Sequence, residues 1–136
     1  MRFDTKIAIV VREDLATWQK LNVTAFLSSA IAATVDDIIG APYEDATGNT
    51  YLPMIRQPVL IYAASQTSLT QVHQRALTRN FPTAVYIEDM FTTTHDEANR
   101  ATVHAVPADD LPLVGLAIYG PRNPIDKTVK GLSLHP

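Results

Sequence analysis

Apolar residues gather along this chain in short continuous runs, each followed by a stretch with helical spacing. The first run, Ile7 to Val11, is rich in β-branched residues and is typical of a strand buried on both faces. From Val23 to Ile38 the apolar positions recur every three or four residues, which predicts a helix with one buried stripe, ending near Gly40. The chain therefore opens with a strand that leads into a helix through a polar connection.

The same alternation continues through the middle of the chain. Val59 to Ala64 is a second short apolar run, and Ser68 with Gln71 forms a capping box that starts a helix ending at Asn80. Thr83 to Glu88 is the predicted third strand. Strands that alternate with helices in this way indicate an α/β fold with helices on both faces of a sheet.

The last third of the chain has a weaker pattern. Thr102 to Val106 is read as a short extended piece, and Leu113 to Tyr119 as a fourth strand that can run antiparallel to the others. Asn123 to Lys130 is predicted to form a turn or a short helix. A polar run, Thr92 to Glu97, comes before the extended piece; it has no apolar period and is assigned to the surface.

Composition narrows the class of protein further. The length of 136 residues predicts a single domain, residues 1–136, and the absence of cysteine excludes disulfides and thiolate chemistry. A net charge of −3 gives no general attraction to nucleic acid, and no apolar run reaches the length of a membrane span, so we expect a cytoplasmic protein. No glycine-rich phosphate loop is present, and His95, Asp96 and His104 lack metal-site spacing, so we predict neither a cofactor nor a metal.

Candidate chemistry is therefore defined by position in the sheet. Asp14 and Lys20 follow the first strand, Asp89 ends the third, and Thr93 lies just beyond it. If those two strands run parallel, their carboxyl ends share one edge of the sheet, where ligands collect in open α/β folds. A lysine and a carboxylate at that edge could orient a water and stabilise an oxyanion. A structural ion pair is the alternative.

Two local features stay open at this stage. A helix capped by Asn22 would place Lys20 at the positive helix end, where a lysine calls for a bound anion, whereas a helix capped by Asp14 would make it an ordinary solvated residue. The stretch from Tyr43 to Gln57 is a long loop or a short hairpin, and its Tyr51 could cover a site or plug the edge of the core.

Three segments resemble the type II peptidyl-tRNA hydrolases. KIAIVVREDL followed by Lys20 is similar to that family's strand ending VVRxDL and its GKxAAQ helix, and VYIEDM with the threonines after it is similar to a strand ending in DAGRT. LVGLAIYGPRNPIDKTVKGLSL resembles the family's closing strand, GP turn, ID pair and final G-x-L-x-L segment. WQKLNVTAFLSSAIA and GNTYLPMIRQPVLIY resemble an uncharacterised bacterial branch with this fold, the domain-of-unknown-function family number two thousand.

The resemblance implies a set of site residues. Lys20, Asp89 and Thr93 match the lysine, aspartate and threonine of the hydrolase motifs and would be the catalytic residues. The predicted substrate-binding residues are Thr24, at the position of the motif's glutamine, together with Asp14, from its place after the first strand, and Tyr51, from the loop that could cover the site.

The hydrolase motifs are also partly lost. Gln19 replaces the glycine before the lysine, Thr24 replaces the glutamine of the helix motif, and Leu27 replaces its histidine. Phe91 and Thr92 replace the glycine and arginine after the aspartate, which removes a phosphate contact. Together with the acidic composition, this argues against an RNA-facing surface.

The combined prediction is a three-layer α/β/α fold of the type II peptidyl-tRNA hydrolase kind, with a mixed, largely parallel sheet of about four strands. The resemblance also implies a homodimer. Two functions remain open. The first is a hydrolase of an ester or amide in a small or nucleotide-linked substrate, and the second is a non-catalytic protein that binds a small ligand or a partner. No membrane association is expected.

Overall fold

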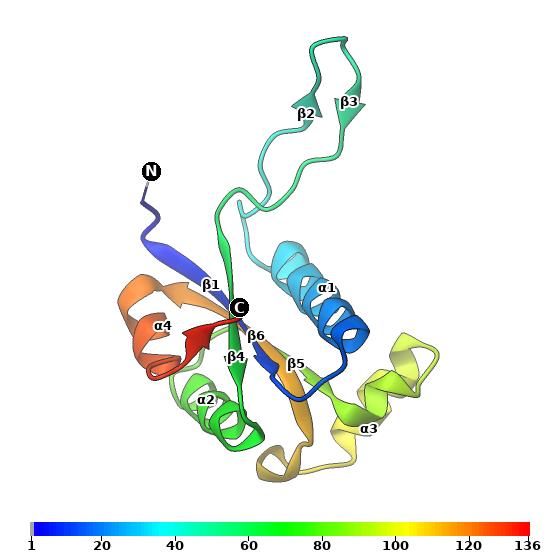
Figure 1. The fold of residues 1–136 in the computed structure, drawn as a ribbon, viewed down its shortest axis with the longest axis vertical. Coiled ribbons are helices and arrows are strands. Elements are labelled where there is room, and N and C mark those ends of the chain that lie inside the picture. Colours follow the sequence, from blue (N-terminus) through cyan, green and yellow to red (C-terminus); the bar gives the residue numbers. More distant parts are fainter. Residues whose placement is uncertain (1) are drawn as a thin grey trace.

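A computed structural model describes residues 2–136 of the chain, as an α/β fold (Figure 1). The strands are β1 (Thr5–Arg12), β2 (Tyr43–Glu44), β3 (Thr50–Tyr51), β4 (Val59–Ala64), β5 (Thr83–Ile87), β6 (Leu113–Pro121) and β7 (Ser133–Leu134). The α-helices are α1 (Thr17–Thr34), α2 (Gln66–Thr78), α3 (Asp96–His104) and α4 (Arg122–Thr128), and the short 3₁₀ helices are η1 (Glu88–Phe91) and η2 (Ala108–Asp110).

The main sheet has five strands in the order β5-β6-β1-β4-β7. The pair β1 with β4 is parallel, and the other three pairs are antiparallel. The sheet is mixed, as predicted, but the expectations of about four strands and of largely parallel pairing were wrong. The reason is that the fourth strand, β6, enters between β5 and β1, and the final G-x-L-x-L segment adds the two-residue edge strand β7.

Helices cover both faces of this sheet, which gives three layers. Alternate residues of β1 point to opposite faces, so Ile7 and Ile9 pack against α1 while Ala8 and Val10 face α2 and α4. All four side chains are fully buried, which explains the continuous apolar run in the sequence. Burying each large side chain contributes roughly 1.5–3 kcal/mol, so the central strand is a major source of stability.

The direction of the strands confirms one expectation that matters for the site. Both β1 and β5 are antiparallel to β6, so they run parallel to each other and their carboxyl ends lie at the same edge of the sheet. Arg12 at the end of β1 is joined to Glu88, directly after β5, by an ion pair of 2.5 Å. The sheet therefore brings the two predicted segments to a common edge.

The first helix begins between the two starts that the sequence left open, and it ends earlier than predicted. Its N-cap is Ala16, whose backbone N–H donates to the side chain of Gln19 at 2.9 Å, so neither Asn22 nor Asp14 is the cap. The helix ends at Thr34, six residues before Gly40, although Ile38 is still buried. In α2 the cap is Ser65 rather than Ser68, and Asn80 has the predicted left-handed conformation, with φ of 57°.

The extended piece predicted at Thr102 to Val106 was wrong, because these residues belong mostly to α3. His95 caps that helix by accepting from the backbone N–H of Ala98, and Asp96 and Glu97 lie in its first turn, where they complement the helix dipole. No residue of α3 is fully buried, and its partly buried face, Ala98, Asn99, Thr102 and Val103, contains one branched apolar side chain, so its apolar stripe is too weak to recognise in the sequence. The β-branched Thr102 and Val103 favoured the mistaken strand.

Residues 39–56, which we call the arm, form a hairpin that projects from the body beyond the end of α1 (Figure 1). Its strands β2 and β3 pair only over Tyr43 with Tyr51 and Glu44 with Thr50. Asp45 holds the tip by accepting from Asn49 and from the Tyr51 hydroxyl, at 2.9 and 2.7 Å. Those bonds, with Asn49 first and Tyr51 second, hold the pKa of Asp45 well below its ordinary value. Of the two predicted forms, the short hairpin is the one observed.

Candidate functional site

Asp14 lies at the carboxyl edge of β1 and is part of an ion-pair cluster. The Nε atom of Arg12 is 2.6 Å from Asp14, and its Nη1 atom is 2.5 Å from Glu88. The two carboxylates are largely exposed, so each pair contributes less than about 1 kcal/mol. Asp14 therefore forms a local ion pair with Arg12, and it is the Arg12–Glu88 pair that links β1 to the end of β5.

Lys20 lies in the first turn of α1 and is half-buried. Its Nζ atom is 3.1 Å from Nε2 of His135, which directly follows β7. The other ring nitrogen of His135 is 3.0 Å from the carbonyl oxygen of Pro136. A proton on Nδ1 would donate to that carbonyl and leave Nε2 free to accept from the Lys20 ammonium. Nothing in the sequence singled out His135, because it is 115 residues from Lys20 and belongs to no motif.

Asp89 and Thr93 make no direct contact with Lys20. Asp89 is exposed in η1, directly after the edge strand β5, whereas the Lys20 amine contacts His135, next to the other edge strand, β7. The first turn of α1 nevertheless adjoins η1, since the Trp18 ring lies 5.8 Å from that of Phe91. Within residues 2–136, no hydrogen bond or ion pair joins Lys20 to Asp89 or Thr93. The structure therefore gives Lys20 a different partner from those that the hydrolase motifs imply.

Thr24 and Tyr51 also lie apart from one another. The Thr24 hydroxyl donates to the carbonyl of Leu21, 2.9 Å away and one turn earlier in α1. Tyr51 is on the arm, 54% exposed, and bonded to Asp45. The 18 residues of α1 span about 27 Å, with Lys20 near one end and the arm beyond the other. Tyr51 therefore covers neither Lys20 nor Asp89.

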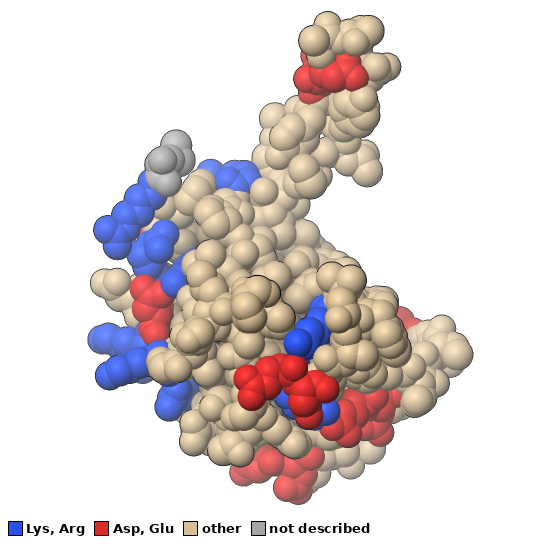
Figure 2. Space-filling model, viewed as in Figure 1, with Lys and Arg blue, Asp and Glu red and all other residues tan. Residues whose placement is uncertain are grey.

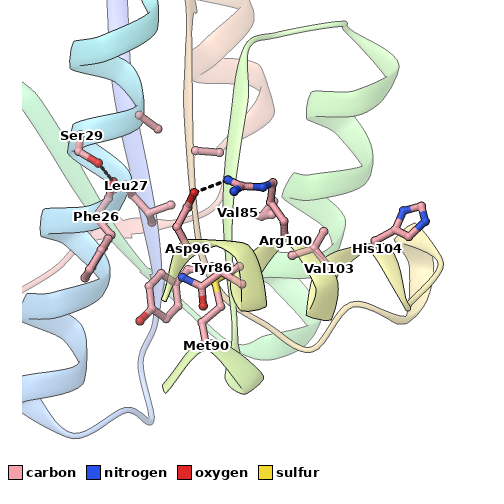
Figure 3. Close-up of a pocket in the computed structure, with 13 residues that line it drawn as sticks. Phe26, Leu27, Ser29, Val85, Tyr86, Met90, Asp96, Arg100, Val103 and His104 are labelled. Atoms are coloured by element: carbon pink, nitrogen blue, oxygen red, sulfur yellow. Dashed lines mark hydrogen bonds and ion pairs between the residues drawn. The ribbon is translucent and has the colours of Figure 1, made fainter. Parts of the chain in front are cut away.

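A groove with a volume of about 630 Å³ lies between α1, the edge strand β5 and α3. Phe26 projects into it from α1, Tyr86 from β5 and Met90 from η1, while Asp96 and Arg100 form an ion pair on α3 (Figure 3). A second hollow of about 380 Å³ adjoins it and contains Thr93. The two share the side chains of Phe26, Tyr86, Met90, Asp96 and Asn99, so they form one continuous groove.

The family described as "Protein of unknown function (DUF2000)" matches residues 5–136. The chain belongs to this family. A solved structure of a protein of unknown function from Agrobacterium tumefaciens is 49% identical to this DUF2000 chain, with a TM-score of 0.96. That match covers 99% of this chain and 100% of the other. No curated protein matches the chain.

Four aromatic rings line one side of the groove in this DUF2000 protein. The Trp18 ring lies 5.8 Å from Phe91, Phe91 lies 5.3 Å from Tyr86, and Tyr86 lies 6.0 Å from Phe26. Burial raises the pKa of Tyr86, so its hydroxyl stays neutral and can act as a hydrogen-bond donor at physiological pH. Such a surface suits an apolar or aromatic ligand.

Polar groups face these rings from the other side of the groove. Thr93 is hydrogen-bonded to Asn99 and donates to the carbonyl of Met90 at 3.1 Å. In the described part of the sheet, β5 pairs only with β6, and Ala84, Val85 and Tyr86 line the groove in succession. The unpaired edge of β5 can therefore offer backbone hydrogen bonds to a ligand.

The sequence could not reveal this groove. It depends on α3, whose start was assigned to a polar surface run and whose end was predicted as an extended piece, and on the position of β5 at the sheet edge. Its aromatic residues, Trp18, Phe26 and Phe91, had no periodic pattern that separated them from core positions. Within residues 2–136 there is no group of three His, Asp or Glu side chains placed to hold a metal ion. No helix of that range is long and apolar enough to span a membrane.

Proposed function

We propose that this DUF2000 protein binds a small, largely apolar ligand in the groove between α1, β5 and α3. The observation that supports this most directly is the groove itself, whose volume of about 630 Å³ is in the usual range for small-molecule sites. The rings of Phe26 and Tyr86 would contact the body of the ligand. Asn99, Arg100 and the edge of β5 would bind its polar end. We propose that the fold is of the type II peptidyl-tRNA hydrolase kind, on the sequence resemblance.

We expect the uncharged fluorescent probe N-phenyl-1-naphthylamine to bind this groove and to quench Trp18, the single tryptophan of the chain, at the groove rim. Replacing Ser29, a small exposed residue of the groove wall, with phenylalanine fills part of the volume. Ser29→Phe should weaken binding about tenfold or more, because it displaces the buried area that one ring contributes. Titration of probe fluorescence and of Trp18 emission measures the change.

The matched control is Ala33→Phe, which adds the same side chain to an exposed position of α1 that does not line the groove. It should change the dissociation constant less than about twofold, since surface changes away from a site are usually small. Equal affinity in Ser29→Phe and wild type would show that the probe binds elsewhere and would refute the groove as the site.

The competing hydrolase hypothesis predicts a different result. Its one structural support is the half-buried Lys20 ammonium beside His135, but in the described chain Lys20 contacts neither the carboxylate nor the hydroxyl assigned to the same reaction. We therefore expect the purified protein to hydrolyse neither peptidyl-tRNA nor a panel of aminoacyl esters above the rate in buffer. Lys20→Ala, checked for folding by circular dichroism, serves as the comparison. Turnover that disappears in Lys20→Ala would overturn the binding hypothesis in favour of catalysis.

We also propose that the protein forms a homodimer through its arm. Of the ten exposed large hydrophobic residues in the described range 2–136, five lie on this hairpin, namely Ile39, Tyr43, Tyr51, Leu52 and Met54. A two-stranded hairpin is marginally stable alone in water, and an exposed apolar patch of this kind usually marks an interface. A hollow of about 480 Å³ lies beside the arm base, where small side chains of α1 such as Ala25, Ser28 and Ala32 leave room for a partner's arm.

A further inference from the structure

The charges of this protein are separated between two ends of the sheet. Although the net charge is −3, seven of the eleven Lys and Arg residues gather where β1 begins and α2 and α4 meet (Figure 2). We call this surface the basic end, and it consists of Arg2, Lys6, Arg75, Arg79, Arg122, Lys127 and Lys130. Two carboxylates, Asp4 and Asp126, lie in the same segments, and Asp126 pairs with Lys6 at 2.5 Å.

Two arginines of the basic end are held side by side. Arg75 lies in the last turn of α2 and Arg79 is the C-cap residue that follows the helix, one turn or about 6 Å further along the axis. The Nη1 atom of Arg75 donates to the carbonyl of Thr128 at 3.2 Å, and that of Arg79 to the carbonyl of Pro124 at 3.0 Å. Neither guanidinium has a carboxylate within ion-pair distance in the described chain. Each therefore keeps N–H groups and a full charge for a ligand.

The side chains around the two guanidiniums are also hydrogen-bonding groups. Arg75 and Arg79 line a hollow of about 430 Å³ together with Gln71, Gln74 and Thr78. No aromatic or branched apolar side chain lines this hollow. The negative end of the α2 dipole is nearby, but it amounts to about half a charge, against two full positive charges. The remaining cations of the basic end add to the same positive field.

We propose that the basic end binds a small ligand through a chain of two or more phosphate groups, with Arg75 and Arg79 as the two principal contacts. Guanidinium groups match phosphate oxygens with paired hydrogen bonds, and their spacing of one turn suits successive phosphates. Single-stranded nucleic acid fits less well, because no large exposed aromatic side chain of α2 or α4 can stack on bases. A membrane fits less well because Leu77 is the one exposed large hydrophobic residue on these two helices.

Isothermal titration calorimetry with inorganic tripolyphosphate tests this proposal on the intact protein. We expect saturable binding that weakens about tenfold or more in Arg75→Gln and in Arg79→Gln, the loss typical of one charge-assisted hydrogen-bonding group. Arg12→Gln is the matched control, since it removes one charge at the other end of the sheet. Arg12→Gln should change the affinity for tripolyphosphate less than about twofold, because the two ends of the sheet are farther apart than the screening length of the salt solution. Equal weakening in all three variants would refute a defined site.

Arg75→Gln and Arg79→Gln also remove hydrogen bonds to the α4 segment, so a further variant is needed to separate the loss of charge from a structural change. Lys127→Gln with Lys130→Gln removes two charges from the basic end at exposed positions, and we expect a smaller but measurable loss of affinity with an unchanged melting temperature. A single-stranded DNA oligonucleotide and vesicles of anionic lipid are titrated in parallel. Failure of tripolyphosphate to bind, or tighter Arg75-dependent binding of the DNA or the vesicles, would overturn the assignment to a small phosphate-chain ligand.

Discussion

Replacing Gly115 with valine should lower the free energy of unfolding by about 3 kcal/mol, the upper part of the usual range for overpacking a core. Gly115 lies in β6 beneath α1, and a Cβ atom there would be 2.6 Å from Cγ1 of Val23 and 3.2 Å from the carbonyl oxygen of Val10. Both neighbours are fully buried, so neither can move without disturbing its own packing. Denaturant unfolding followed by circular dichroism measures the loss.

The structure also says which second change should relieve the strain. Val23→Ala alone leaves a cavity and should cost about 1–3 kcal/mol, but in a Gly115→Ala background it removes the methyl group that the new Cβ atom strikes. The double variant should therefore be more stable than the sum of the two single losses by at least about 1 kcal/mol. Additive losses would show that Gly115 is not limited by its contact with α1.

The strands were easier to predict from the sequence than the candidate site, because burial leaves a local pattern of apolar residues. Ile7 to Val11 forms a central strand with both faces covered, so a continuous apolar run is the direct consequence of its burial. The strands β4 and β5 are only partly buried, but they too fall where the apolar runs predicted them. The helix α3 has only a partly buried face with few large apolar residues, so its sequence carries a much weaker signal.

The candidate site depended instead on the lateral order of the strands. The parallel directions of β1 and β5, which the site hypothesis required, are observed, but contact between Lys20 and Asp89 also depends on how segments distant in sequence pair with these strands. The strand β6 enters between β1 and β5, and β7 joins the outer side of β4 and places His135 beside Lys20. These are pairings between segments distant in sequence, and no local pattern determines them.

The aromatic groove and the basic end are two separate candidate binding surfaces. The aromatic groove contains Thr93 and lies toward the carboxyl end of β5, whereas the basic end lies where β1 begins. They differ in chemistry as well, since one is lined by rings and the other by guanidinium and amide groups. A ligand that needs both would have to span the sheet, so binding of an apolar probe and binding of tripolyphosphate should be independent.

Leu52→Glu on the arm should weaken self-association at least about 100-fold, which corresponds to about 2.7 kcal/mol. Leu52 is 85% exposed in the single chain, so the substitution removes no contact that the monomer makes. In a dimer formed through the arm, the same position would be covered, and a buried carboxylate without a partner costs several kcal/mol. Sedimentation equilibrium of wild type and variant over a range of concentrations measures the dissociation constant.

Leu77→Glu provides the matched control, because it makes the same chemical change at an exposed leucine of α2, away from the arm. The two variants have the same net charge and should melt at similar temperatures as monomers, so a difference between them reports on the interface alone. If Leu77→Glu dissociates the dimer as strongly as Leu52→Glu, the interface involves α2 or general charge repulsion. If wild type is itself monomeric at high concentration, the apolar arm does not mediate self-association and its exposed tyrosines and leucine must be covered by a different partner.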